Sequence, residues 1–185
     1  MAFVILSNYM HNPIHIKKAT IEDRATVVSL GQRTFRETYP ELIQHPDVQE
    51  YLKHKFSDES VEHDLNHPMS RFYIGYVHHA PVAFTRLRFD RTAEGLCSNK
   101  MIELEQIYVL KEYQGFKVGK EMMDKCKQIA MDERFDTLWL QVWQQNQKAI
   151  QFYQKAGFVV YETAQFSYGK NLLQEDYLMR LDFYY

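Results

Sequence analysis

The sequence predicts a single α/β domain built on a mixed sheet, and three observations lead to this fold class. The 185 residues are 45% hydrophobic and 15% aromatic, which is enough for one compact core and too little for two ordinary domains. Hydrophobic spacing switches repeatedly between the period of two of a strand and the period near 3.6 of a helix. The elements interleave in the expected order β-α-α-β-β-β-α-β-α-β-β. We expect residues 1–13 to be an N-terminal extension and residues 14–185 to form the domain.

The first predicted elements are a short strand and a helix. "IHIKKA" alternates as a strand does, and Thr20 opens a capping-box-like start for a helix that ends near Thr38. Pro40 and Pro46 interrupt the helical pattern. "DVQEYLKHKF" and "DESVEHDLNH" then predict two short polar helices joined at Ser57. These helices are expected to cover the core.

The remaining elements follow in the same way. "RFYIGYVHHAPVAFTRLRF" predicts two strands with a turn around His79 to Pro81, and "MIELEQIYVL" predicts a further strand of an antiparallel meander. From Gly115 the spacing becomes helical until near Arg134. "TLWLQVW" predicts a buried strand, "NQKAIQFYQKAGF" a helix that Gly157 ends, and "VVYET" and "DYLMRLDF" two closing strands.

Composition narrows the classes of partner and location. The net charge of -2 comes from 22 basic and 24 acidic residues that are scattered along the chain, which argues against nucleic-acid binding and favours small-molecule partners. Two cysteines, Cys97 and Cys126, predict no structural disulfide and a cytoplasmic protein. "MAFVIL" lacks the basic lead of a signal peptide, and no segment approaches ~18 apolar residues, so we expect no membrane span.

The stretch "YQGFKVGKEMM" lies between a predicted strand and a predicted helix. A turn at this place presents unpaired backbone N–H groups at the positive end of the helix dipole, which favours phosphate binding. Gly115 and Gly119 allow close approach, and Lys117 and Lys120 supply charge. An ordinary helix start with solvated lysines is the alternative. Glu121 stands where a P-loop requires Ser or Thr, and the Rossmann glycine pattern is absent, so ATP and NAD are not expected.

Two motifs resemble the GNAT superfamily of acetyl-CoA-dependent N-acetyltransferases. The family's phosphate loop reads Q/R-x-x-G-x-G/A after a strand, and this chain has Gln114, Gly115, Phe116, Lys117, Val118 and Gly119 after Ile107, Tyr108 and Val109. Lys117 departs from the pattern, since the family usually has a glycine there. The family's second motif, N-x-x-A-x-x-F-Y-x-K-x-G-F, is matched at Asn146, Ala149, Phe152, Tyr153, Lys155, Gly157 and Phe158.

The resemblance implies a GNAT-type fold, in which a mixed, mostly antiparallel and twisted sheet is flanked by helices, with acetyl-CoA as cosubstrate and no metal. The strand that carries Val109 would splay from its neighbour, and the Val109 N–H would face the thioester oxygen. Tyr153 would be the general acid, or would merely pack, and Asn146 would cap its helix and contact the coenzyme. The implied coenzyme-binding residues are Ile107, Tyr108, Val109, Gln114, Gly115, Phe116, Lys117, Val118, Gly119, Lys120, Asn146 and Tyr153.

A general base must take a proton from the acceptor amine, and two glutamates are candidates. By the period of two, Glu103 and Glu105 share a strand face with Ile107 and Val109. Either glutamate could instead be an ordinary surface residue. The segment 37–64 is rich in carboxylates, which predicts an acidic wall for a polycationic amine or simply a solvated helix pair. These carboxylates are Glu37, Glu41, Asp47, Glu50, Asp58, Glu59, Glu62 and Asp64, against Lys53 and Lys55.

We therefore expect direct acetyl transfer to a primary amine, with a polyamine as the leading acceptor. "TFRETYPEL", "EYLKHKFSDESVEHDL" and "RFYIGY" resemble the bacterial spermidine/spermine branch, whereas the tail "GKNLLQEDYLM" departs from its G-D-D-x-Q-x-D-Y pattern. The alternatives are an amino acid, an aminoglycoside or a protein N-terminus as acceptor, or a non-catalytic acyl-CoA sensor. A homodimer stays open. The pairs His63/His67 and His78/His79 lack the partners of a metal site.

Overall fold

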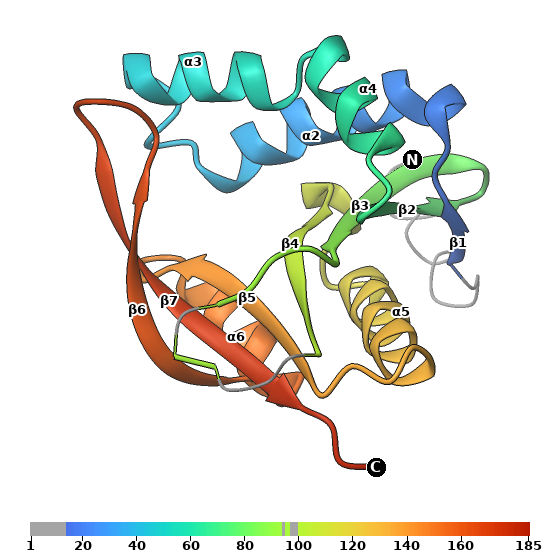
Figure 1. Ribbon diagram of the computed structural model, residues 1–185. Helices are drawn as coiled ribbons and strands as arrows, with labels where there is room; N and C mark the ends of the chain where they lie inside the picture. The colour runs from blue at the N-terminus through green and yellow to red at the C-terminus, as the bar shows by residue number, and fades with distance from the viewer. Residues whose placement is uncertain (1–13, 94, 97–99) are drawn as a thin grey trace.

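The computed structural model describes residues 14–93, 95–96 and 100–185 (Figure 1). The expected extension at residues 1–13 and Cys97 therefore lie outside the described residues. Seven strands form one sheet in the order β1-β2-β3-β4-β5-β7-β6. Only the β4–β5 pair is parallel, so the expected mixed and mostly antiparallel sheet is confirmed. The strands are β1 His15–Lys18, β2 Ser70–Val77, β3 Ala80–Arg88, β4 Met101–Val109, β5 Thr137–Trp143, β6 Val159–Ser167 and β7 Leu173–Asp182.

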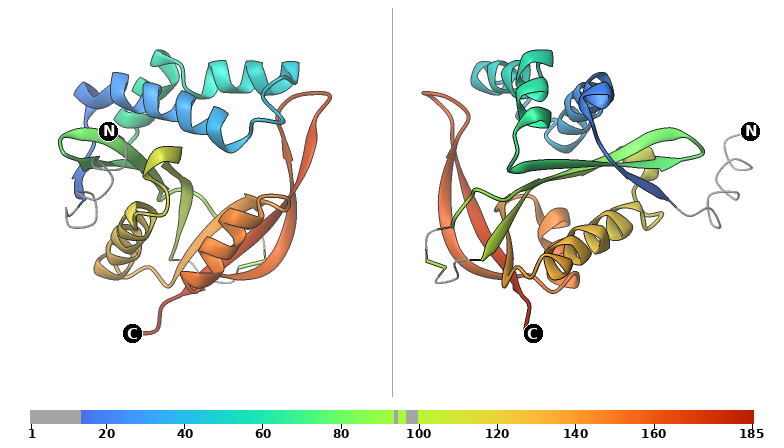
Figure 2. Two further views of the ribbon diagram at one scale, coloured as in Figure 1. Left: turned by 180° about the vertical axis from the view of Figure 1, so that it is seen from behind. Right: turned by 45° about the vertical axis from the view of Figure 1, so that its right-hand side comes forward.

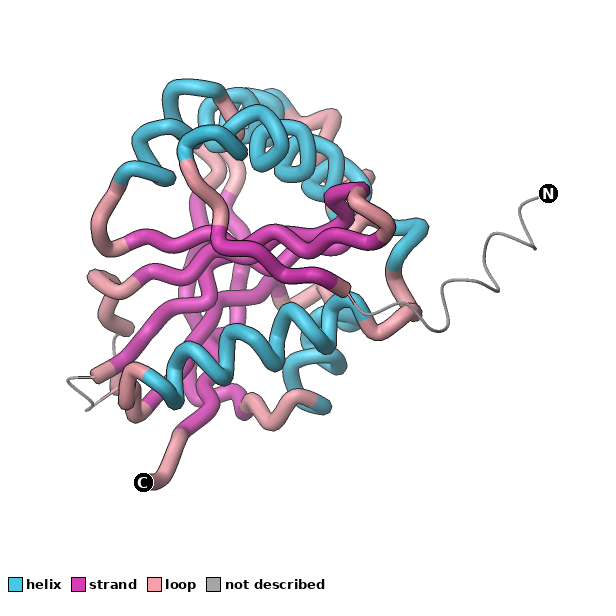
Figure 3. Tube along the Cα trace, turned by 90° about the vertical axis from the view of Figure 1, so that its right-hand side faces the viewer, coloured by secondary structure: helices cyan, strands magenta, loops and turns pink. Residues whose placement is uncertain are grey.

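Two helical layers enclose the sheet, as Figure 3 shows. One layer holds α2, α3 and α4, and the views in Figure 2 show α5 and α6 together on the opposite face. Between β1 and β2 the described chain has α2, α3 and α4, the three helices predicted segment by segment, so the expected order β-α-α-β counts one helix too few. The helices are α2 Arg24–Thr38, α3 Pro46–Lys55, α4 Asp58–Asn66, α5 Val118–Asp132 and α6 Gln147–Lys155, with single 3-10 turns at Ile21–Asp23 and Lys111–Tyr113.

Local chemistry explains where the helices begin. The Thr20 N–H donates to Asp23 Oδ2 at 2.9 Å, which completes the expected capping box, and α2 continues from the 3-10 turn that follows. The N–H of Ser60 donates to Ser57 Oγ at 3.1 Å and opens α4. The apolar residues that give the segment after Gly115 its helical spacing lie on one buried stripe of α5. Its members are Val118, Met122, Met123, Cys126 and Ile129.

A bulge in β4 decides which side chains face which layer. Arg86 of β3 pairs with Gln106 and Leu87 pairs with Leu104, so Glu105 is an extra residue without a cross-strand partner. An extra residue shifts the alternation of side chains by one position. Side chains beyond Glu105 therefore lie on the faces opposite to those that a strict period of two predicts.

The expectation that Glu103, Glu105, Ile107 and Val109 share one face is therefore wrong for the last two. Glu105 contacts α3 through Lys55, with 2.6 Å between Oε1 and Nζ. Ile107 lies opposite Thr85, whose Oγ1 is 3.3 Å from Cys126 Sγ in α5. The glutamates thus face α2–α4, whereas Ile107 faces α5.

Candidate active site

The strands β4 and β5 separate over most of their length. Their pairing runs only from Met101–Thr137 to Glu103–Trp139, although β4 extends to Val109 and β5 to Trp143. Figure 1 shows the two strands diverging from this short contact. We call the interval between the unpaired halves the splay. The expected splay of the strand that carries Val109 is confirmed.

Backbone polar groups line the β4 side of the splay. The Leu110 N–H donates to Val82 O of β3 at 2.9 Å. Because successive N–H and C=O groups of a strand point to opposite sides, those of Val109 and Ile107 point away from β3 and into the splay. The Val109 carbonyl there accepts a hydrogen bond from Gln114 Nε2 at 2.9 Å. The Val109 N–H thus faces the splay, as the sequence prediction required.

The loop before α5 has the backbone shape of an anion site. Gly115 has φ +86° and Lys117 has φ +65°, and a Cβ added at Gly115 would meet nothing within 4 Å. The first bond of α5 runs from Glu121 N to Lys117 O at 3.0 Å. The N–H groups of residues 118–120 precede this bond, so they have no acceptor within the helix and are available to a phosphate.

The two lysines of this loop differ in their surroundings. Lys117 is exposed and forms the N-cap of α5 in the left-handed region, a conformation that glycine adopts more easily than lysine. Lys120 forms an i,i+4 ion pair with Asp124, with 2.5 Å between Nζ and Oδ2. Lys117, which makes no ion pair within the described part of the chain, is therefore the freer positive charge. Loop shape and charge together fit the phosphates of acetyl-CoA.

Helix α6 places the second motif beside this loop. Asn146 Oδ1 accepts from Ala149 N at 3.1 Å, which confirms the capping role expected for Asn146. A Cβ added at Gly119 of α5 would lie 3.6 Å from the Phe152 ring, so α5 and α6 pack closely here. Tyr153 is half-buried against Phe152 and Phe158. Burial raises the pKa of the Tyr153 phenol above its ordinary value, so the hydroxyl keeps its proton.

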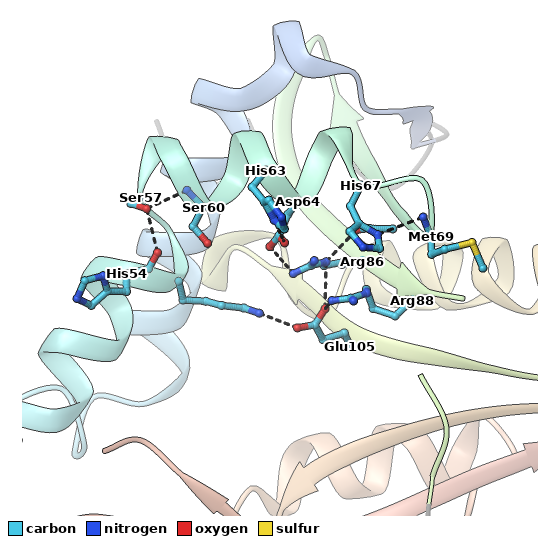
Figure 4. Close-up of polar contacts among 12 residues, drawn as sticks. His54, Ser57, Ser60, His63, Asp64, His67, Met69, Arg86, Arg88 and Glu105 are labelled. Carbon is cyan, nitrogen blue, oxygen red and sulfur yellow. Dashed lines mark hydrogen bonds and ion pairs between the residues drawn. The ribbon is translucent and has the colours of Figure 1, made fainter. Parts of the chain in front are cut away.

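The two candidate bases have different environments. Glu105 is ion-paired with Lys55 and with Arg86, whose Nε lies 3.0 Å from Glu105 Oε2, and Figure 4 shows it facing Arg86 and Arg88. Burial, and after it the negative charge of Glu105, raises the pKa of the Glu103 carboxyl to about 7. Glu103 is therefore the glutamate that exchanges a proton near neutral pH.

Arg86 is a residue whose importance the sequence reasoning missed. Its side chain is 1% exposed and lies in β3, where Nη1 is 2.5 Å from Asp64 Oδ2 of α4. Its Nε also donates to Ser70 Oγ at 3.0 Å. Arg86 of β3 thereby links α4, β2 and β4 through Asp64, Ser70 and Glu105. Arginine at alternate positions 86 and 88 of an otherwise apolar strand was the available signal.

Four tyrosines and a tryptophan gather on the α2–α3 side of the splay. The rings of Tyr51 and Tyr168 are 5.2 Å apart, and those of Tyr39 and Trp143 are 6.1 Å apart. Burial raises the pKa values of Tyr39, Tyr51, Tyr108 and Tyr168. We call these four residues the tyrosine cluster. Only Tyr108 was expected near the site, because the other three come from distant parts of the chain.

Half of the eight carboxylates of segment 37–64 pair with arginines of the described chain. Asp58 and Glu62 pair with Arg24, and Asp64 pairs with Arg86. Glu37 pairs with Arg33 and accepts a hydrogen bond from the Lys111 N–H, and Asp47 accepts one from the Asn171 N–H. The chain itself thus offsets part of the expected wall, which favours the alternative interpretation of a solvated helix pair.

The chain belongs to the acetyltransferase (GNAT) family, whose model matches residues 32–158. It is an N-acetyltransferase that uses acetyl-CoA as cosubstrate. No helix in the described part of the chain is long and apolar enough to cross a membrane. Among the same residues, no group of three or more His, Cys, Asp or Glu could hold a metal ion.

Individual relatives agree with this assignment. A spermidine N(1)-acetyltransferase from Thermoplasma acidophilum is 27% identical over 154 residues, which cover 81% of this chain and 91% of the relative. An uncharacterized N-acetyltransferase from Lactobacillus delbrueckii subsp. lactis is 22% identical over 167 residues, covering 90% and 96%. The crystal structure of the PaiA N-acetyltransferase from T. acidophilum in complex with coenzyme A has a TM-score of 0.76 at 21% identity, covering 93% of this chain and all of that one.

Proposed function

We propose that this enzyme transfers the acetyl group directly to a primary amine, with a polyamine such as spermidine or spermine as acceptor. The observation that carries this proposal is the splay, because the backbone donor at Val109 opens into it, while the proton acceptor Glu103 lies on the same strand where the paired half ends. The spermidine acetyltransferase relative supports the choice of acceptor. Direct transfer needs a preorganised donor and a proton acceptor that the amine can reach, and it needs no nucleophile on the enzyme.

The coenzyme would be held along one edge of the splay. The N–H groups of residues 118–120 and the charge of Lys117 bind its phosphates, and the polar groups of Ile107 and Val109 bond the pantetheine arm. Acetyl-CoA supplies an acetyl group activated as a thioester. The Val109 N–H stabilises the oxyanion that develops during transfer, a contribution of roughly 3 kcal/mol for a preorganised donor.

Two side chains handle the protons. The pKa of Glu103, about 7, is closer than that of an ordinary carboxyl to the ~10 of an alkylammonium, so Glu103 is the stronger base. Because roughly 20 Å of strand separates it from Val109, it would accept the amine proton through a chain of water molecules. Glu105 does not take this role, because its charge is held by Lys55 and Arg86. Tyr153, which stays protonated, donates to the departing thiolate.

The test combines coenzyme binding with turnover. Calorimetry measures the affinity for acetyl-CoA, and a thiol-release assay measures turnover on polyamines, amino acids, aminoglycosides and peptides. We expect thiol release on spermidine or spermine. Tyr153→Phe should lower kcat while it leaves the Kd for acetyl-CoA nearly unchanged. Tyr76→Phe, a half-exposed tyrosine of β2, is the matched control and should change neither.

Three outcomes would count against the proposal. Turnover on an amino acid, aminoglycoside or peptide without turnover on polyamines would move the acceptor to that class. Coenzyme binding without release on any acceptor would favour a sensor. Ping-pong kinetics, or an acetylated protein trapped without acceptor, would contradict direct transfer.

A further inference from the structure

Asp176 is a buried carboxylate on the same side of the sheet as the tyrosine cluster. It lies in β7, is 3% exposed, and is the cross-strand partner of Trp143. Its Oδ1 accepts from Gln174 Nε2 at 2.6 Å, and its Oδ2 accepts from Gln141 Nε2 at 2.9 Å. No lysine, arginine or histidine of the described chain forms an ion pair with it. A buried carboxylate held only by neutral amides is costly, so a cation at this place would be strongly favoured.

Gln174 gives an independent indication of a missing donor. This residue is 9% exposed, and its Nε2 is bonded to Asp176. Its Oε1 is buried and has no hydrogen-bond partner within the described residues. The amide end of Gln174 therefore brings an unpaired acceptor next to a carboxylate without a counter-cation. An ammonium group carries one positive charge and three donors, so it satisfies both.

The surroundings suit an alkylammonium better than a hydrated metal ion. The Trp143 side chain shares the sheet face of Asp176 and packs 6.1 Å from the Tyr39 ring. The charge of Asp176 also acts on the hydroxyls of Tyr39 and Tyr168, so these groups lie near one another. Aromatic faces attract ammonium groups and cover methylene chains.

Asp176 and the reacting centre lie on opposite sides of β5. Tyr39 lies near both sides, since Tyr108 of β4 and Asp176 of β7 both influence the pKa of its hydroxyl. Paired strands are about 4.8 Å apart, so β4 and β7 are separated across β5 by at least roughly 10 Å. Because β4 and β5 diverge at this end, an amine at Val109 and a cation at Asp176 are at least that far apart, which suits the two ends of an extended diamine.

We propose that Asp176 and Gln174 bind a second ammonium group of the acceptor, so that the enzyme selects diamines and polyamines over monoamines. This inference rests on the proposed function in taking an amine as the acceptor. It adds a specificity site that is separate from the groups that move protons. Charge-assisted hydrogen bonds of this kind contribute about 1.5–3 kcal/mol, which corresponds to roughly a 10- to 100-fold change in KM.

The kinetic test compares acceptors that differ by one amine. Octamethylenediamine and octylamine have the same chain, and spermidine is the polyamine. Asp176→Asn should raise KM for spermidine and the diamine at least about tenfold, with a smaller effect on kcat, and should leave octylamine unchanged. Glu175→Gln, an exposed carboxylate one residue away, is the control and should change none of these. An equal KM change for diamine and monoamine, or no change, would overturn the proposal.

A binding test separates this proposal from the proposed function. Spermidine alone, without acetyl-CoA, should raise the Tm of the wild-type protein and not that of Asp176→Asn, because a ligand stabilises the state that binds it. If no amine is acetylated, the proposed function fails while this shift still tests the site. If Asp176→Asn does not fold, Gln174→Met removes the unpaired Oε1 and should show the same loss in part. Equal Tm shifts in wild type and variant would refute the site.

Discussion

Replacing Lys117 by glycine should stabilise the protein. Lys117 has φ +65° and ψ 0°, a left-handed conformation that costs an L-residue about 1–2 kcal/mol. Glycine removes this cost but adds roughly 0.5–1 kcal/mol of unfolded-state entropy. The net gain expected for Lys117→Gly is about 0.5–1 kcal/mol. At this chain length that gain raises Tm by roughly 1–4 °C, which urea and thermal denaturation can both resolve.

The same position tests the phosphate loop. Lys117→Ala loses the charge and keeps the strain, whereas Lys117→Gly loses both. Both variants should bind acetyl-CoA a few-fold more weakly than wild type, since an exposed charge contributes about 0.5–1 kcal/mol. Their affinity should also depend less on salt. Calorimetry at low and high ionic strength measures both effects.

Arg134 provides the matched control for this prediction. It has φ +58° after the C-terminal end of α5, so Arg134→Gly should also relieve backbone strain. The gain in stability is reduced by the loss of the contact between the Arg134 guanidinium and the Tyr185 ring. It should not change the affinity for acetyl-CoA. A Lys117→Gly protein less stable than Lys117→Ala would refute the strain argument. An unchanged Kd and salt dependence would refute the role of the charge.

Two further predictions concern Glu103 and the helix packing. Glu103→Gln should lower kcat/KM by roughly 10²–10⁴ and remove an acid limb with a midpoint of about 7; a limb that persists would exclude Glu103 as the base. Because the folded-state pKa of Glu103 is raised, its ionisation costs stability as pH rises through about 7, so this variant should gain Tm relative to wild type at alkaline pH and not at acid pH. Gly31→Ala places a Cβ 2.1 Å from Phe56 Cδ1 and should lower the free energy of unfolding, measured by urea denaturation, by about 1–3 kcal/mol. Ser29→Ala, at an exposed position of the same helix, should leave that free energy nearly unchanged. Equal stabilities of the two variants would contradict the close packing at Gly31.

Features that depend on neighbouring residues were predictable from the sequence. The stripe of α5, the cap at Asn146 and the loop before α5 each use residues within about two turns of one another. Backbone geometry alone relates such residues, so their spacing predicts their arrangement. The splay and the coenzyme loop followed from these motifs together with the family resemblance.

The prediction of side-chain faces failed in β4, where the pairing with the neighbouring strand β3 decides which way each side chain points. The bulge at Glu105 exists because Leu104 and Gln106 pair with successive residues of β3, and a period of two cannot reveal it. The error reversed the faces of Ile107 and Val109. The choice between an acidic wall and a solvated helix pair was likewise beyond the sequence, because partners such as Arg86 and Asn171 reach those carboxylates only in the folded chain.

By itself, the sequence determined the family and the helices and strands on either side of the loop before α5, because these depend on short-range spacing. Only the tertiary structure decided which glutamate titrates near neutral pH and which groups gather around Asp176. Burial and the charges that surround a group set its pKa. Contacts such as those of Tyr39, Trp143 and Asp176 bring together α2, β5 and β7, and only the folded sheet places these elements side by side.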